Sequence, residues 1–110
     1  MNLNEYQTAA ARTMRTDMDE MTALAVLGLG LTGEAGEVAE VIKKHVGHGH
    51  ELDHEAVTKE LGDVLWYVAA IATTLDIDLA TVAAVNIAKL RARYPDGFDS
   101  EASRNRVDRF

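Results

Sequence analysis

Proline placement constrains the fold of this 110-residue chain most, because its only proline is Pro95, close to the C-terminal end. No proline ring therefore interrupts a helix anywhere before that position. The polar–apolar alternation typical of strands is missing, whereas Ala, Leu, Glu and Lys are abundant. The sequence predicts an all-α fold, a four-helix bundle formed by a single domain that covers residues 1–110.

Four helices are predicted from the apolar spacing and the end signals. They cover about Asn4–Arg15, Met21–Val46, His54–Leu75 and Leu79–Tyr94. Asn4 and Asp78 are the expected N-caps of the first and last helices, because Asn and Asp side chains accept bonds from free helix N–H groups. Close helix packing or a bend near Gly30–Gly33 would explain why the second helix tolerates several glycines, which weaken a helix.

Charge and composition limit the possible partners. The net charge of −7 argues against binding to nucleic acid or to acidic membranes, which reward clustered Lys and Arg. Cysteine is absent, so disulfides and thiolate metal sites are excluded, and a reducing cytoplasm is the expected location. The longest apolar run, Ala23–Leu31, is far shorter than the roughly 20 residues that span a bilayer, and no targeting segment is visible.

Acidic residues recur within the apolar part of the second predicted helix. On a helical wheel Glu34 falls inside the apolar face, Glu37 lies on its rim and Glu40 points away. The centre of that face is predicted to be Leu31, Ala35, Val38 and Ile42, with Val41 on one flank.

The third predicted helix repeats this arrangement. Glu60 sits at the edge of its apolar face, and Asp63 lies one step further round on the same side. That face is predicted to be Val57, Leu61, Val64, Val68 and Ile71. Two helices therefore offer carboxylate pairs at i and i+3 on equivalent edges.

Four carboxylates near a core need a positive partner, because burying unpaired charge is costly. Lys43 and Lys59 point away from the acids, and Lys44 lies one to two turns beyond Glu37. A hard divalent cation, Mg²⁺ or Mn²⁺, would offset the repulsion, with water and a phosphate as its further ligands. One pair alone could equally be a solvated helix edge in an oligomer, but the second, matched pair favours a metal site.

Other candidate residues lie on the third and fourth helices. Asn86, Lys89 and Arg93 share one face, which could grip phosphates or could be an ordinary cationic helix end. Tyr67 lies one turn after Asp63, whereas Trp66 points elsewhere and is expected to pack against another helix or a partner chain. The four histidines, His45, His48, His50 and His54, lack the helical i, i+4 pairing of a zinc site. They are interpreted as structural residues in or beside a Gly-rich loop, with contact to substrate or phosphate as the alternative.

The segments "GEAGEVAE" (33–40) and "KELGDVLWY" (59–67), followed by "NIAKLRARYPDGF" (86–98), resemble the MazG-like nucleoside triphosphate pyrophosphohydrolases, the all-α NTP pyrophosphatase superfamily. The resemblance implies a helical bundle that assembles as a homodimer or a dimer of dimers. It also implies Mg²⁺-dependent hydrolysis of a (d)NTP between the α and β phosphates, which yields the monophosphate and pyrophosphate.

The resemblance also implies roles for particular residues. Glu34, Glu37, Glu60 and Asp63 would be the metal ligands and the catalytic carboxylates, with Glu37 the favoured base. The substrate-binding residues would be Tyr67, which contacts the base, and Asn86, Lys89 and Arg93. Many relatives carry a further acid where Gly33 stands here, so the number of metal ions is left open.

Two other functions are compatible with a helical bundle. A di-iron carboxylate protein would need two Glu-x-x-His motifs on helices, but the only one here, Glu51–His54, falls in a predicted loop. A non-catalytic module for nucleotide sensing or protein association is the second alternative. In each case the Gly-rich, apolar second helix is expected to pack against another copy of the chain, with residues of both chains near each site.

Overall fold

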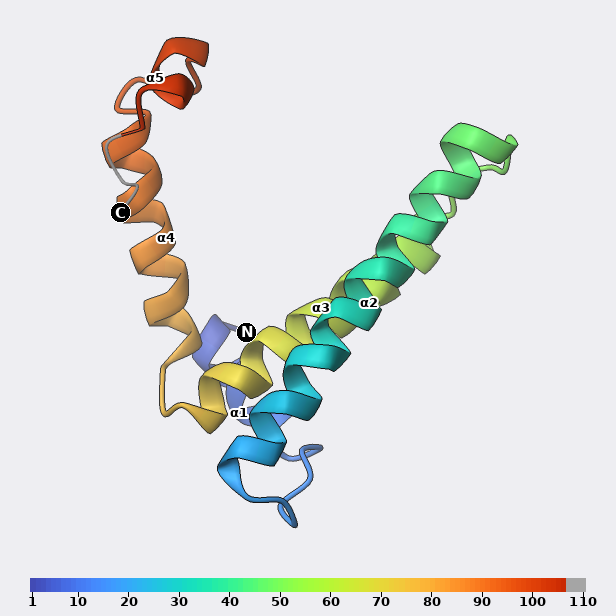
Figure 1. The fold of residues 1–110 in the computed structure, drawn as a ribbon, viewed down its shortest axis with the longest axis vertical. Helices are drawn as coiled ribbons and strands as arrows, with labels where there is room; N and C mark the ends of the chain where they lie inside the picture. The colour runs from blue at the N-terminus through green and yellow to red at the C-terminus, as the bar shows by residue number, and fades with distance from the viewer. Residues whose placement is uncertain (107–110) are drawn as a thin grey trace.

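The computed structural model describes residues 1–106, and this part of the chain contains five helices and no strand. These are α1 (Leu3–Ala11), α2 (Glu20–His48), α3 (His54–Thr74), α4 (Leu79–Arg93) and α5 (Ser100–Arg104). Figure 1 shows their arrangement. The predicted all-α class is confirmed, and α2, α3 and α4 begin and end within two residues of the predicted positions.

The ends of α2 and α3 follow from their capping residues. Asp19 accepts a hydrogen bond from the Thr22 N–H, and Asp53 accepts bonds from the first N–H groups of α3. Gly49, with φ of 72°, closes α2 in the left-handed conformation that glycine adopts without strain.

The predicted bounds of the first helix were wrong at both ends. Asn2, not Asn4, is the N-cap, and it forms a reciprocal capping box with Glu5. The helix stops at Ala11 rather than Arg15, because the N–H and the hydroxyl of Thr13 both donate to the Ala10 carbonyl. Such local bonds from a threonine compete with continued helix.

Two arms diverge from the base of the molecule. α2 and α3 run antiparallel, side by side, and form the hairpin arm, while α1 packs across the base against α3 (Figure 1). α4 leaves α3 at a bend of 105° and forms the second arm of a V. Within the described residues the helices of one chain therefore do not close into a bundle, because no helix of the chain lies along most of α4.

No single helix of residues 1–106 has the length and apolar character needed to cross a membrane. α3 and α4 pass that test only as a pair, and the pair is sharply bent.

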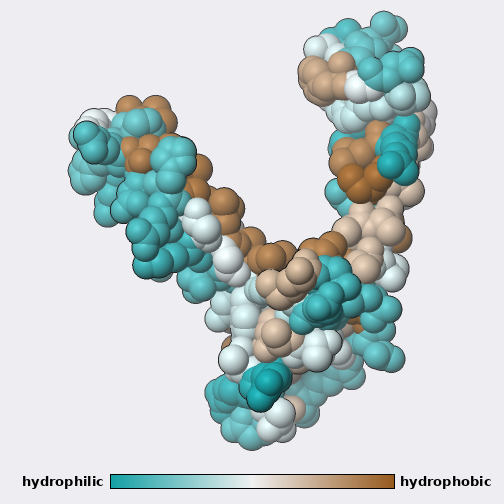
Figure 2. All heavy atoms as spheres, turned by 180° about the vertical axis from the view of Figure 1, so that it is seen from behind, coloured by the Kyte–Doolittle hydropathy of each residue, from teal (hydrophilic) through white to brown (hydrophobic). Residues whose placement is uncertain are grey.

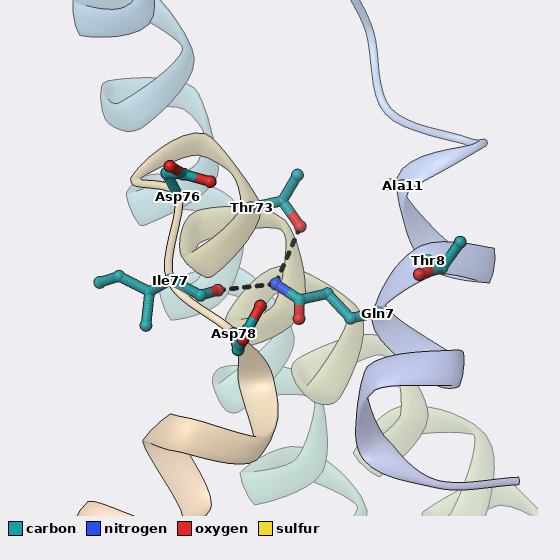
Figure 3. Close-up of a pocket in the computed structure, with 7 residues that line it drawn as sticks. All are labelled: Gln7, Thr8, Ala11, Thr73, Asp76, Ile77 and Asp78. Carbon is teal, nitrogen blue, oxygen red and sulfur yellow. Dashed lines mark hydrogen bonds between the residues drawn. The ribbon is translucent and has the colours of Figure 1, made fainter.

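Gln7 of α1 holds the corner between α3 and α4 (Figure 3). Its Nε2 donates to the Thr73 hydroxyl at 3.1 Å and to the Ile77 carbonyl at 2.8 Å. Its Oε1 accepts from the Leu79 N–H at 2.7 Å.

The first turn of α4 is thus capped from α1. The Ala80 N–H is bound by the Asn4 side chain at 3.1 Å, next to the Gln7 bond. Asp78 occupies the predicted N-cap position, but its side chain makes no capping bond. Because free N–H groups at a helix start need partners, α1 fixes the direction in which α4 leaves.

The core of one chain is small and lies where α1, α3 and the start of α4 meet. Its buried residues are mostly alanine, with Trp66 packed against them. The Trp66 Nε1 donates to the Thr13 hydroxyl at 2.8 Å, and packing of Trp66 against another helix is confirmed.

Three residues predicted to be core are exposed: Ala35, Ile42 (47% exposed) and Leu61 (52% exposed). α3 meets α2 along the line of Leu27, Glu34 and Val41 instead, which leaves the Ala35–Ile42 side of α2 without a helix against it.

Candidate functional site

Three of the four predicted ligand carboxylates meet between α2 and α3. Oxygen atoms of Glu34, Glu60 and Asp63 all lie within 4.8 Å of one another. In residues 1–106 they form the only group of three or more His, Asp or Glu side chains with ligand atoms this close. Glu34 of the first predicted i, i+3 pair thus faces both members of the second pair, Glu60 and Asp63, across the contact of α2 with α3.

The electrostatics of this acidic group are unfavourable without a cation. The pKa of Glu34 is raised above its ordinary value, first because the side chain is half-removed from water, then because of the charges of Asp63, Glu37 and Glu60. Lys43 and Lys59 point away from the acidic group, as predicted, and pair with Glu40 at 3.3 Å and Glu55 at 3.2 Å. Lys44, predicted near Glu37, pairs with Glu40 at 3.9 Å instead.

Glu37 lies outside the three-carboxylate group. It is exposed on α2, one turn after Glu34, and its charge is among the causes of the raised Glu34 pKa. Glu37 therefore lies at the solvent side of the site, and none of the ion pairs within residues 1–106 involves its carboxylate.

The donor set of the acidic group fits a hard divalent cation. Three carboxylates on two packed helices supply only oxygen, which suits Mg²⁺ or Mn²⁺ better than metals that prefer nitrogen or sulfur. None of the four histidines joins the group. The His45 Nδ1 instead lies 2.7 Å from the His50 carbonyl, at the far end of the hairpin arm.

Tyr67 packs directly on the backbone of α2. A Cβ added at Gly30 would overlap the Tyr67 ring, whereas an added Cβ at Gly28, Gly33 or Gly36 would meet open space. The close helix packing predicted near Gly30–Gly33 is therefore confirmed, and Gly30 is the glycine that makes the contact. The Trp66 and Tyr67 rings contact each other edge to face, with centroids 4.9 Å apart.

An apolar hollow of about 130 Å³ lies beside these rings. The walls include Met14 and Met18 from the α1–α2 connection, Leu27 from α2, and both aromatic rings. Along α3 it begins one turn beyond Asp63. Neither methionine was predicted to line a site. Met18 falls in a predicted connection, which has no period that would reveal which side chains turn inward, and Met14 falls within the part of the first predicted helix that the structure does not form.

Tyr6 of α1 is a second neighbour that the sequence did not reveal. Burial raises the pKa of its phenol first, and the charge of Asp63 raises it further. A neutral hydroxyl is thus held near the acidic group. No feature of α1 distinguishes Tyr6 from an ordinary core tyrosine.

The predicted phosphate-binding residues lie on the other arm. Asn86 and Lys89 line an open hollow of about 410 Å³ together with Val82, Val85 and residues at the start of α4. The Arg93 guanidinium lies over the Tyr94 ring, 5.6 Å from its centroid. Asn86 and Lys89 come together, but no residue of the acidic group lines their hollow.

Comparison with known proteins supports the same family as the sequence motifs. Residues 23–98 match the family described as the MazG nucleotide pyrophosphohydrolase domain. The Gene 37 protein of Mycobacterium phage L5 is 37% identical over 114 residues, which cover 96% of this chain and 100% of the phage protein. No solved structure matches significantly. The chain therefore belongs to the MazG nucleotide pyrophosphohydrolase family.

Proposed function

We propose that this protein is a Mg²⁺-dependent nucleoside triphosphate pyrophosphohydrolase that converts a (d)NTP into its monophosphate and pyrophosphate. The observation that carries this proposal is the acidic group itself, three converging carboxylates whose neighbouring lysines are all engaged elsewhere. Membership of the MazG family supports the reaction type.

Glu34, Glu60 and Asp63 would hold Mg²⁺, with Mn²⁺ as a possible substitute and Glu37 as a possible fourth ligand. The bound ion would supply positive charge to the triphosphate oxygens. Carboxylates on two packed helices need little rearrangement to bind, and such preorganisation is the main contribution a protein makes to phosphoryl transfer.

Glu37 is our choice for the general base. It is exposed at the edge of the acidic group and can accept the proton of a water molecule that attacks the α-phosphorus. The new bond joins the water oxygen to that phosphorus, and the bond from the α-phosphorus to the bridging oxygen breaks. Pyrophosphate then leaves with that oxygen.

The apolar hollow beside Tyr67 and Trp66 would receive the base. It lies about one helical turn from Asp63, and the ribose and α-phosphate of a nucleotide would span this separation. Contact with an aromatic ring contributes roughly 1–3 kcal/mol per base, and the two methionines can adapt to the shape of the ligand.

The direct test is an assay of pyrophosphate and monophosphate release from a panel of NTPs and dNTPs with Mg²⁺. We expect Glu60→Gln and Asp63→Asn to abolish turnover while helix content is kept. Glu40→Gln is the matched control, because Glu40 is also an α2 carboxylate but pairs with Lys43 and Lys44 outside the site. Unchanged rates in Glu60→Gln and Asp63→Asn would refute the assignment.

Fluorescence of Trp66, the only tryptophan, provides a binding measurement that does not depend on turnover. We expect a non-hydrolysable nucleotide to change this fluorescence, because the indole lines the hollow proposed for the base. Binding without product from any substrate of the panel would instead indicate a non-catalytic nucleotide-binding module.

A further inference from the structure

The apolar hollow differs from the other exposed apolar surface of the chain in how its walls are held. On the face drawn in Figure 2, the most hydrophobic residues follow the edges of the two arms. Apolar character alone therefore does not mark a ligand site on this chain. The hollow lies between α2, α3 and the α1–α2 connection (residues 12–19), and hydrogen bonds orient two of its walls.

The hydroxyl of Thr13 takes part in both of these bonds. It accepts a hydrogen bond from the Trp66 Nε1 at 2.8 Å and donates one to the Ala10 carbonyl, also at 2.8 Å. A threonine hydroxyl has one donor hydrogen and two acceptor positions, so it can make both bonds at once. The indole of α3 is thereby tied through Thr13 to the last turn of α1.

The bond to Thr13 fixes the orientation of the Trp66 ring. A tryptophan side chain rotates about two dihedral angles, and its ring nitrogen is its only hydrogen-bond donor. This nitrogen is bound to Thr13, and the ring makes an edge-to-face contact with Tyr67. The indole is therefore held at two points, which sets its position as a wall of the hollow.

Thr13 also determines where the methionine wall of the hollow begins. Its N–H and its hydroxyl both donate to the last turn of α1, and the chain then enters the connection that carries Met14 and Met18. Arg15 and Asp17 form an ion pair within the connection, but both side chains are exposed, and an exposed pair contributes little to stability. Thr13 is thus the residue that joins the methionine wall to the aromatic wall.

We propose that Thr13 is a positioning residue for ligand binding in the hollow. It holds the Trp66 indole and the start of the methionine wall at the separation that receives a flat aromatic ring. For nucleotides this role rests on the function proposed above, which assigns the hollow to the base. Thr13 is not part of the acidic group, so its loss should weaken binding of the base and leave the chemical step unaffected.

Thr13→Val tests the orientation of the indole in the protein without ligand. Valine keeps the shape of threonine but lacks the hydroxyl, and Trp66 is the only tryptophan, so fluorescence reports this side chain alone. We expect its emission to shift to longer wavelength and acrylamide to quench it more strongly, because the indole N–H must turn to water.

Two control variants accompany Thr13→Val. Thr13→Ser keeps the hydroxyl and should give the wild-type spectrum. Thr58→Val removes a hydroxyl that donates only to the His54 carbonyl within α3, at 2.7 Å, and should also leave the spectrum unchanged.

Ligand affinity tests the positioning role. We expect Thr13→Val to raise the KM of a nucleoside triphosphate, and the Kd of a non-hydrolysable analogue, by about 2-fold to 10-fold, the range that one net hydrogen bond represents. The kcat should stay within about 2-fold of the wild type, because the acidic group is intact. Inorganic tripolyphosphate has no base, so as a competitive inhibitor with Mg²⁺ it should bind the wild type and Thr13→Val equally.

The possible outcomes separate this proposal from the proposed function. An unchanged Trp66 spectrum in Thr13→Val would overturn the proposal, and so would a changed spectrum with wild-type nucleotide affinity. Equal weakening of tripolyphosphate and nucleotide would overturn it as well. A wild-type protein that binds no nucleotide would refute the proposed function, while a changed spectrum in Thr13→Val would still support Thr13 as the residue that holds the indole.

Discussion

Gly30 of α2 lies against the phenol ring of Tyr67 on α3 so closely that a single methyl group at Gly30 would overlap the ring. The contact lies between the acidic group and the apolar hollow, one turn from Glu34 on α2 and one turn from Asp63 on α3. It thus sets the spacing of the two helices at the position where both parts of the proposed site meet.

We expect Gly30→Ala to lower the free energy of unfolding. Overpacking of this kind costs about 1–3 kcal/mol. The roughly 1 kcal/mol that alanine gains in helix propensity offsets part of that cost. Urea denaturation followed by Trp66 fluorescence measures the difference.

Gly28→Ala is the matched control for Gly30→Ala. An added Cβ at Gly28 meets nothing within 4 Å, so only the propensity gain applies and the variant should be more stable by up to about 1 kcal/mol. Equal effects of the two substitutions would contradict the close contact with Tyr67.

Removal of metal should lower the stability of the wild-type protein and leave that of Asp63→Asn nearly unchanged. With EDTA, Asp63→Asn should be the more stable by up to about 1 kcal/mol, because one of three converging charges is gone. With Mg²⁺ at 100 times its dissociation constant, the wild type should gain about 2.7 kcal/mol and the variant little. Thermal unfolding with and without Mg²⁺ checks both expectations, and an equal Mg²⁺ effect on the two proteins would count against the metal site.

The raised pKa of Glu34 predicts a particular pH dependence in EDTA. The folded state retains the Glu34 proton at pH values where the unfolded chain has released it, so the ionised group destabilises the fold at neutral pH. This penalty should disappear as the pH falls from the raised folded pKa toward the ordinary 4.5.

The variant Glu34→Gln isolates this effect. It should be more stable than the wild type at pH 7, and its advantage should shrink as the pH approaches the ordinary value for glutamate. Unfolding curves of both proteins between pH 7 and pH 4.5 make the comparison. A constant difference would show that the carboxyl is not perturbed in the fold.

Gln7→Leu should destabilise the corner between α3 and α4. The change removes the partners of the Thr73 hydroxyl, the Ile77 carbonyl and the Leu79 N–H. Leaving such groups unsatisfied costs about 1–3 kcal/mol. Thr8→Ala provides the control, because Thr8 is exposed on α1 and donates only to the Asn4 carbonyl within its own helix. A loss no greater than that of the control would show that Gln7 does not hold the corner.

The features that depend on local periodicity could be predicted from the sequence alone. The 3.6-residue period predicted the ends of α2 and α3 to within two residues of where the structure has them. The helical wheels placed Glu34 and Glu60 on edges that face each other in the structure. They also located Lys43 and Lys59 away from the acids, because the direction of a side chain on a helix follows from its position alone.

The predictions that failed concern features that depend on contacts between segments distant in the sequence. Ile42 and Leu61 are as apolar as the buried residues, but the line along which α3 meets α2 passes to one side of them. Asp78 is at the predicted N-cap, yet its side chain makes no capping bond, and the Leu79 N–H donates to the Gln7 side chain of α1 instead. No rule of local spacing indicates such an interaction.

The bond between Gln7 and the Leu79 N–H also has a consequence for the order of events after synthesis. It closes a loop of 72 residues, and contacts across so long a separation form late in folding. The last long helix therefore acquires its orientation only when the opening segment has docked.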